Sequence, residues 1–133
     1  MISVIIVAHG KMAEGLLSTA KMVLGPQKRM RAFSVSSSSN TDKLIDKLGS
    51  LIDELDEGQG VLIMTDLFGG TPANISLSFL GQKKVEVITG VNLPMIIKTA
   101  NLSESDDLEY VRDQVVAYGK ENILNANRIL DNA

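Results

Sequence analysis

The chain contains one histidine, His9, which follows directly after an apolar run, Ile2–Ala8, that is typical of a buried strand. Histidine is well suited to exchange charge near neutral pH, and its ring nitrogen can carry a covalent group. In α/β proteins, the carboxyl ends of parallel strands are where ligands bind and reactions occur. The position of His9 therefore favours a functional role over that of a structural histidine.

Asp66 follows another buried run, Val61–Thr65, in the same way. A nucleophilic histidine needs one ring nitrogen free and the other held by an acceptor, and a carboxylate in that place also stabilises the charged ring. We therefore expect His9 and Asp66 to form a catalytic pair at one edge of a sheet. The structural alternative for Asp66 is a turn or capping aspartate.

The segment Gly69-Gly70-Thr71-Pro72 has the composition of an anion-binding loop before a helix. Glycines let backbone amides approach a ligand, and a helix start adds positive potential. Gly70 and Thr71 are therefore candidate phosphate-binding residues, with the Thr71 hydroxyl as an extra donor. The spacing differs from that of mononucleotide and dinucleotide loops, so we predict no nucleotide cofactor.

Three further features should lie at the same edge. We interpret Ser36–Ser39 as a solvated loop whose hydroxyls and amides could reach a phosphate. We interpret Asn92 as a helix cap, and the alternative role for it is to line the pocket. Phe68 either folds back onto the core or offers a contact to a partner protein. One histidine, one carboxylate and an anion cradle suit a phosphohistidine relay, because a hydrolase would need a second acid or base, or a metal.

Apolar runs of strand length alternate with segments of helical period along the chain. This alternation predicts an α/β fold: a doubly wound, mainly parallel sheet of order 2-1-3-4 with helices on both faces. The expected strands are 2–8, 30–35, 61–65 and 85–89, and the expected helices are 12–24, one starting at 40 or 41, 71 to about 80, one starting at 92–94, and 105–118. Gly119 should cap the last helix, and residues 122–130 fit either a continuing helix or a short edge strand.

Length, composition and net charge limit the classes of protein to which this chain can belong. The 133 residues suffice for one domain, 1–133, and 44% hydrophobic with 22% charged residues is typical of a soluble globular protein. A net charge of −3 argues against nucleic acid as the main partner. With no cysteine and a single imidazole, we expect neither disulfides nor a metal site. We find no signal peptide and no membrane span, and therefore expect a cytoplasmic protein.

Three motifs in order make the chain resemble the IIA component of the mannose family of the bacterial sugar phosphotransferase system. They are Ala8-His9-Gly10, the segment Thr65-Asp66-Leu67-Phe68-Gly69-Gly70-Thr71-Pro72-Ala73-Asn74, and Gly90-Val91-Asn92-Leu93-Pro94-Met95. The resemblance implies that His9 accepts a phosphoryl group from HPr at Nε2 and passes it to a separate IIB protein, with Asp66 holding Nδ1. It also implies phosphoryl contacts from Gly70 and Thr71, and a docking role for Phe68, where some relatives have tryptophan.

The same resemblance implies a homodimer in which a C-terminal strand is exchanged and runs antiparallel at the sheet edge. The region after Gly119 could supply that strand. Because many relatives carry a fused IIB domain and this chain ends before one could begin, we expect IIB to be a separate polypeptide. The transported sugar is not predicted, since in this family it is chosen by IIB and the membrane components.

Three alternatives remain open on the sequence. A phosphoryl-donor subunit for dihydroxyacetone kinase would keep the fold and the histidine, although the Gly-Gly-Thr-Pro and Val-Asn-Leu-Pro-Met segments favour the sugar transporter. A non-catalytic regulatory module would use the phosphorylation as a signal only. A flavin binder of flavodoxin shape is allowed by the fold, but 4% aromatic residues and no tryptophan argue against it.

Overall fold

Four parallel strands form one sheet in the order β2-β1-β3-β4, which confirms the predicted fold class and strand order. The coordinates are a computed structural model, and the structure describes residues 1–131. The strands are β1 (Ser3–His9), β2 (Met30–Val35), β3 (Val61–Thr65) and β4 (Val85–Thr89). The helices are α1 (Met12–Leu24), α2 (Thr41–Leu55), α3 (Gly70–Leu77), α4 (Leu93–Thr99), α5 (Leu108–Glu121) and α6 (Ala126–Asp131).

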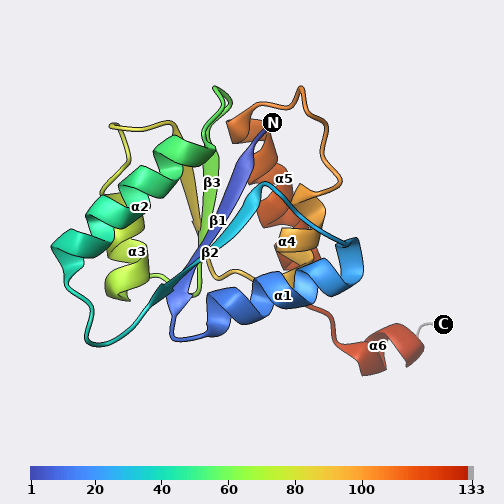
Figure 1. Cartoon of the computed structure of the whole chain (residues 1–133). Coiled ribbons are helices and arrows are strands. Elements are labelled where there is room, and N and C mark those ends of the chain that lie inside the picture. Colours follow the sequence, from blue (N-terminus) through green and yellow to red (C-terminus); the bar gives the residue numbers. More distant parts are fainter. Residues whose placement is uncertain (132–133) are drawn as a thin grey trace.

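Helices cover both faces of the sheet (Figure 1). Helices α2 and α3 lie on one face, and α1, α4 and α5 lie on the other. Residues alternate between the two faces of a strand, so the central strand β1 supplies both cores: Val4 and Ile6 pack on the side of α1, and Ile5 and Val7 on the side of α2. Because β1 and β3 are buried on both faces, their sequences are continuous apolar runs.

The parallel register brings the ends of β1, β2 and β3 to one edge. His9 pairs with Val35 at the end of β2, and Val7 pairs with Thr65 at the end of β3. The end of β3 is fixed further by two amides that follow β4, because Gly90 N and Val91 N donate to Thr65 O at 3.0 and 2.9 Å. This edge, at the bottom of Figure 1, therefore carries the first residue of each following loop.

Some predicted helix ends are wrong for local reasons. Helix α5 begins at Leu108 and not at 105, because the Asp107 side chain caps it by accepting from Tyr110 N at 2.8 Å. Thr71 does not cap α3, because the helix already begins at Gly70 and its N-cap is Gly69, without a side-chain cap bond. Gly119 does not end α5, which continues to Glu121. A Cβ at Gly119 would lie 2.6 Å from Met95 Cγ, so this glycine allows α5 to pack closely on α4.

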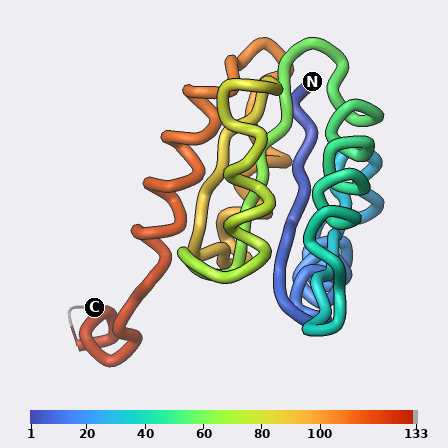
Figure 2. The backbone as a smooth tube through the Cα atoms, turned by 90° about the vertical axis from the view of Figure 1, so that its left-hand side faces the viewer, coloured from blue at the N-terminus to red at the C-terminus, as the bar shows by residue number. Residues whose placement is uncertain are grey.

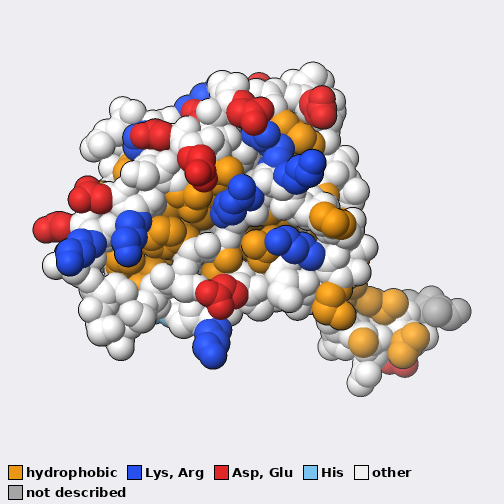
Figure 3. Space-filling view, viewed as in Figure 1, with side chains coloured by type: hydrophobic (Ala, Val, Ile, Leu, Met, Phe, Trp, Pro, Cys, Tyr) orange, Lys and Arg blue, Asp and Glu red, His pale blue; other side chains and the backbone are white. Residues whose placement is uncertain are grey.

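After α5 the chain leaves the body of the molecule, and the C-terminal segment stands apart from it (Figures 1 and 2). Residues 126–131 form the helix α6, so the exchanged strand that the resemblance implies is not formed in this single chain. The space-filling view shows hydrophobic side chains gathered on this projection (Figure 3). They are Ile123, Leu124, Ile129 and Leu130, all exposed. No helix among residues 1–131 is long and apolar enough to cross a membrane.

Candidate functional site

His9 is the last residue of β1, and its side chain is 50% exposed at the edge of the sheet. The backbone of His9 is fixed because it belongs to β1, a strand of seven residues that is buried from Ser3 to Ala8. The next amide, Gly10 N, donates to Val35 O at 2.9 Å and so ties the start of the following loop to β2. His9 therefore presents a solvent-accessible ring from a rigid strand end.

Asp66 lies directly beside His9, as the sequence predicts. Its Oδ2 accepts from the backbone N of His9 at 2.9 Å and contacts the ring Nδ1 of His9 at 2.7 Å, and its Oδ1 accepts from Leu67 N at 3.0 Å. The carboxylate is only 7% exposed, whereas the imidazole it contacts is half exposed. This arrangement fixes one ring nitrogen and leaves the other, Nε2, open to a ligand.

The electrostatics of Asp66 follow from these contacts. Burial raises the pKa of the carboxyl, but the hydrogen bonds from the backbone and ring of His9 and from the Leu67 amide outweigh it and hold the pKa below its usual range. Asp66 is therefore a carboxylate at neutral pH, and its negative charge stabilises a positive charge on the His9 ring.

Gly69 and Gly70 bring the start of α3 against the open face of that ring. Both have a positive φ, 103° and 81°, which L side chains rarely adopt. A Cβ at Gly70 would lie 3.2 Å from His9 Nε2, so the backbone of α3 approaches the free nitrogen closely. With no side-chain cap at the helix start, the first-turn amides of Gly70 and Thr71 are donors without an intrahelical partner. Such an end favours an anion.

A cleft of about 590 Å³ opens over the histidine. One side is formed by Thr71 at the start of α3, and the other by Ser36, Ser37 and Ser39 after β2. We expected Ser36–Ser39 at this edge, as a solvated loop whose hydroxyls and amides could reach a phosphate. Three of these serines line the cleft, because the residue pair His9–Val35 in the strand register brings the loop after β2 next to the histidine.

Asn92 does not belong to this cleft. Its side chain caps α4 by accepting from Met95 N at 3.1 Å, as predicted, and it also donates to Gly119 O at 3.2 Å. Together these two bonds join α4 to α5. Asn92 instead lines a smaller cavity of about 110 Å³ next to Gly119.

Phe68 is 79% exposed, so it does not fold back onto the core. Leu67 and Met12 are exposed as well. Each of the three follows a strand that ends at the edge carrying His9: Met12 comes after β1, and Leu67 and Phe68 come after β3. Exposed apolar side chains therefore lie in the loops at the same edge as the half-exposed histidine.

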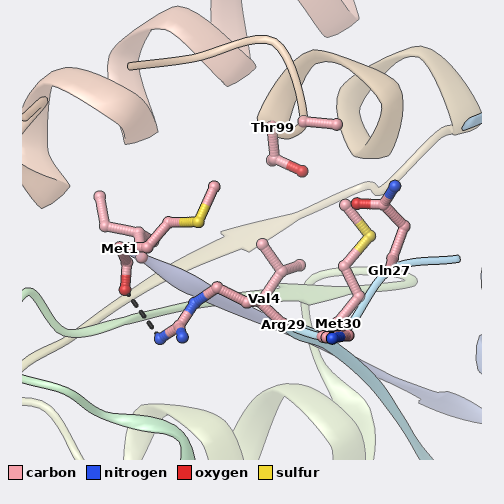
Figure 4. Close-up of a pocket in the computed structure, with 9 residues that line it drawn as sticks. Met1, Val4, Gln27, Arg29, Met30 and Thr99 are labelled. Carbon is pink, nitrogen blue, oxygen red and sulfur yellow. Dashed lines mark hydrogen bonds between the residues drawn. The ribbon is translucent and has the colours of Figure 1, made fainter. Parts of the chain in front are cut away.

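A second cavity, of about 360 Å³, opens at the amino ends of the strands (Figure 4). Met1, Val4 and Met30 give it apolar walls. The guanidinium of Arg29 on its lining is engaged with Met1 O at 2.9 Å and with Glu57 at 2.8 Å. Since this cavity has no acid–base pair and lies at the edge opposite His9, the cleft over His9 is the candidate functional site. Within residues 1–131, no group of three or more His, Cys, Asp or Glu side chains is placed to hold a metal ion.

Comparison with known proteins agrees with this fold. The family model described as the PTS system fructose IIA component, EIIA-man, matches residues 3–116. The chain therefore belongs to the mannose-type IIA family of the phosphotransferase system.

Individual relatives support the same assignment. The chain is 36% identical over 121 residues to the mannose-specific EIIAB component of Escherichia coli (strain K12), covering 90% of this chain and 36% of that protein. It is 31% identical over 105 residues to the fructose-specific EIIA component of Bacillus subtilis (strain 168), covering 78% of this chain and 72% of that protein. The chain thus spans about a third of the length of the mannose-specific relative.

Solved structures give the same result. A PTS IIA protein associated with the fucose utilization operon of Streptococcus pneumoniae has a TM-score of 0.85 at 28% identity, with 97% of this chain and 96% of that chain covered. A component EIIA from Streptococcus agalactiae has a TM-score of 0.84 at 27% identity, with 96% and 99% covered.

Proposed function

We propose that the chain is a phosphoryl-transfer intermediate of the bacterial sugar phosphotransferase system. His9 accepts a phosphoryl group from HPr and passes it to a IIB component during sugar uptake. The observation that carries the proposal is the 2.7 Å contact between His9 Nδ1 and Asp66 Oδ2, with Nε2 beside Gly70 at an open cleft. Membership of the IIA family supports it.

The transfer uses His9 Nε2 as the nucleophile. With its proton on Nδ1 and donated to Asp66, the neutral ring has a free electron pair on Nε2. That pair forms the new N–P bond while the P–N bond of the donor breaks, and the donor nitrogen keeps its electron pair. No proton has to move. The phosphorylated ring gains positive charge, which the Asp66 carboxylate stabilises.

Gly70 and Thr71 are proposed to bind the phosphoryl oxygens. The first-turn amides of α3 have no side-chain cap to compete for them, and Thr71 lines the cleft. Such preorganised donors stabilise the negative charge of the group in transit. Pro72, the next residue, has no N–H to contribute but fits the first turn of the helix.

Exposed apolar side chains near His9 are proposed to dock the protein partners. Phe68 and Leu67 are both mainly exposed in the loop after Asp66. A large apolar side chain held in solvent is typical of protein interaction sites. Since donor and acceptor must each bring a reactive group to His9, we place HPr and IIB on this same surface in turn.

We further propose that residues 1–133 form one IIA domain that acts in the cytoplasm as a homodimer. The support for the dimer is the projecting C-terminal segment, whose apolar side chains are exposed in the single chain. A second copy that covers Ile123, Leu124, Ile129 and Leu130 would remove them from water.

The test is a phosphorylation assay with phosphoenolpyruvate, enzyme I and HPr, read by intact mass. We expect one added phosphoryl group that is acid-labile and is lost in His9→Ala, which keeps the fold. Retained labelling in His9→Ala, or no labelling of the wild-type chain, would contradict the proposal.

The acceptor is tested separately, by offering the phosphorylated chain a IIB protein of the mannose family. Transfer to IIB is expected. Transfer to dihydroxyacetone kinase instead would identify the chain as a donor subunit of that kinase. Transfer to neither acceptor, combined with phosphorylation-dependent binding of a regulator, would identify a regulatory module.

A further inference from the structure

The loop after β2, Ser36–Ser39, forms the wall of the cleft opposite α3. Ser36, Ser37 and Ser39 line the same cleft as His9 and Thr71, whereas Ser38 does not. The loop is held at this place because Gly10 N donates to Val35 O at 2.9 Å. An anion bound to His9 would therefore lie between the helix start and the serines.

Three of the four hydroxyls in this loop are engaged with one another. Ser36 Oγ lies 2.8 Å from Ser39 Oγ and 3.3 Å from Ser38 Oγ, and Ser39 Oγ also accepts from Ser36 N at 3.3 Å. A backbone bond from Ser39 N to Ser36 O, at 3.2 Å, closes the turn. Ser37 differs, because its exposed hydroxyl makes no hydrogen bond within the described part of the chain.

The cleft contains no lysine or arginine among its lining residues. A phosphoryl group there would have to be held by amide and hydroxyl donors rather than by a cationic side chain. The donors at the start of α3, Gly70 and Thr71, lie on one side only. The phosphoryl oxygens that point away from α3 would face the loop Ser36–Ser39. There the Ser37 hydroxyl can donate without breaking the hydrogen bonds among Ser36, Ser38 and Ser39.

We propose that Ser37 is a phosphoryl-binding residue, whose hydroxyl donates a hydrogen bond to the group in transit at His9 Nε2. This inference rests on the proposed phosphohistidine function. The hydroxyl keeps its proton throughout: the donor P–N bond breaks, the N–P bond to His9 forms, and Ser37 only stabilises the oxygens that carry the negative charge.

The test compares Ser37→Ala with Ser38→Ala, the same change one residue further on in the same loop but outside the cleft. Phosphorylated HPr is mixed with each full-length variant in a rapid-quench single-turnover experiment over a range of HPr concentrations. For Ser37→Ala we expect the rate at saturating HPr to fall about tenfold, the loss typical of one hydrogen bond to a charged group. The HPr concentration giving half the maximal rate should stay within twofold.

Ser38→Ala should react within twofold of the wild-type rate, and Ser37→Thr, which keeps the hydroxyl, should recover most of the loss. Equal rates for Ser37→Ala and Ser38→Ala would overturn the inference while leaving the proposed function intact. A loss in Ser37→Ala that Ser37→Thr does not recover would overturn it as well. Absence of phosphorylation in the wild-type chain would overturn the proposed function and this inference together.

Discussion

A single carboxylate oxygen, Asp66 Oδ2, binds both the backbone amide and the ring of the same residue, His9. The two contacts, at 2.9 and 2.7 Å, orient the ring and its parent backbone together. The imidazole is therefore positioned from one side only, and its other nitrogen is left free for chemistry. A substitution of Asp66 can therefore remove its negative charge and still keep an acceptor oxygen for these hydrogen bonds.

Asp66→Asn keeps an acceptor oxygen but removes the charge. We expect HPr to bind this variant normally and phosphoryl transfer to slow by roughly 100-fold, because an amide does not stabilise the positive ring. Rapid-quench kinetics over a range of HPr concentrations separate the two effects. Wild-type kinetics in this variant would mean that Asp66 is only a turn residue.

The lowered pKa of Asp66 predicts how stability depends on pH. Because the folded pKa lies below the unfolded value of about 3.9, the contribution of Asp66 is complete above that value and is lost as pH falls through the folded pKa. The difference in unfolding free energy between wild type and Asp66→Asn should therefore shrink as the pH falls below about 4. Denaturant unfolding at several pH values measures this difference, and a difference that grows below a pH of about 4 would contradict the assignment.

At the scale of elements, the start of α3 depends on a glycine next to His9 Nε2. Gly70→Ala places a Cβ 3.1 Å from His9 Cε1 at a φ of 81°. We expect a loss of about 1 kcal/mol in stability from the strained backbone and a severe loss of phosphorylation, since the methyl group occupies the face where we propose that the phosphoryl group binds.

Gly81→Ala is the matched control for this change. Gly81 has a φ of 80°, yet a Cβ there meets nothing within 4 Å. It should lose a similar amount of stability in thermal or denaturant unfolding and still accept phosphate at the wild-type rate. A comparable loss of phosphorylation in both variants would mean that backbone strain, and not contact with His9, is responsible.

The elements show why some parts of the molecule could be predicted and others could not. Apolar runs define β2, β3 and β4 to the residue, and parallel topology alone then brings His9 and Asp66 to one edge. The position of Ser36–Ser39 at that edge also follows from the topology, whereas which of the serines line the cleft depends on the conformation of the loop and not on its composition.

Gly119 shows why the end of α5 was predicted wrongly. A glycine near the end of a helical pattern usually signals a cap, but here tertiary packing against Met95 requires it inside α5. The tail was ambiguous for a related reason, since residues 126–131 have no buried side chain in the single chain and hence no packing partner to determine their state.

At the scale of the whole molecule, the C-terminal projection predicts the oligomeric state. We expect the full chain to be a dimer in light scattering coupled to size exclusion, and Leu130→Asp to shift it toward monomer, because a charge cannot be buried in an apolar interface without a large cost. Met22→Asp is the control, as Met22 is also a largely exposed apolar residue but lies on α1. A wild-type monomer, or equal dissociation by both variants, would contradict the proposed interface.

The residues proposed for the site all lie between positions 9 and 71, on β1, the loop after β2, the end of β3 and the start of α3. The part of the chain after α3 holds the end of β3 through the backbone amides of Gly90 and Val91, which donate to the carbonyl of Thr65. The C-terminal segment proposed to form the dimer shares no residue with the proposed site. Substitutions in that segment can therefore change how the protein assembles without altering the residues proposed for the chemistry.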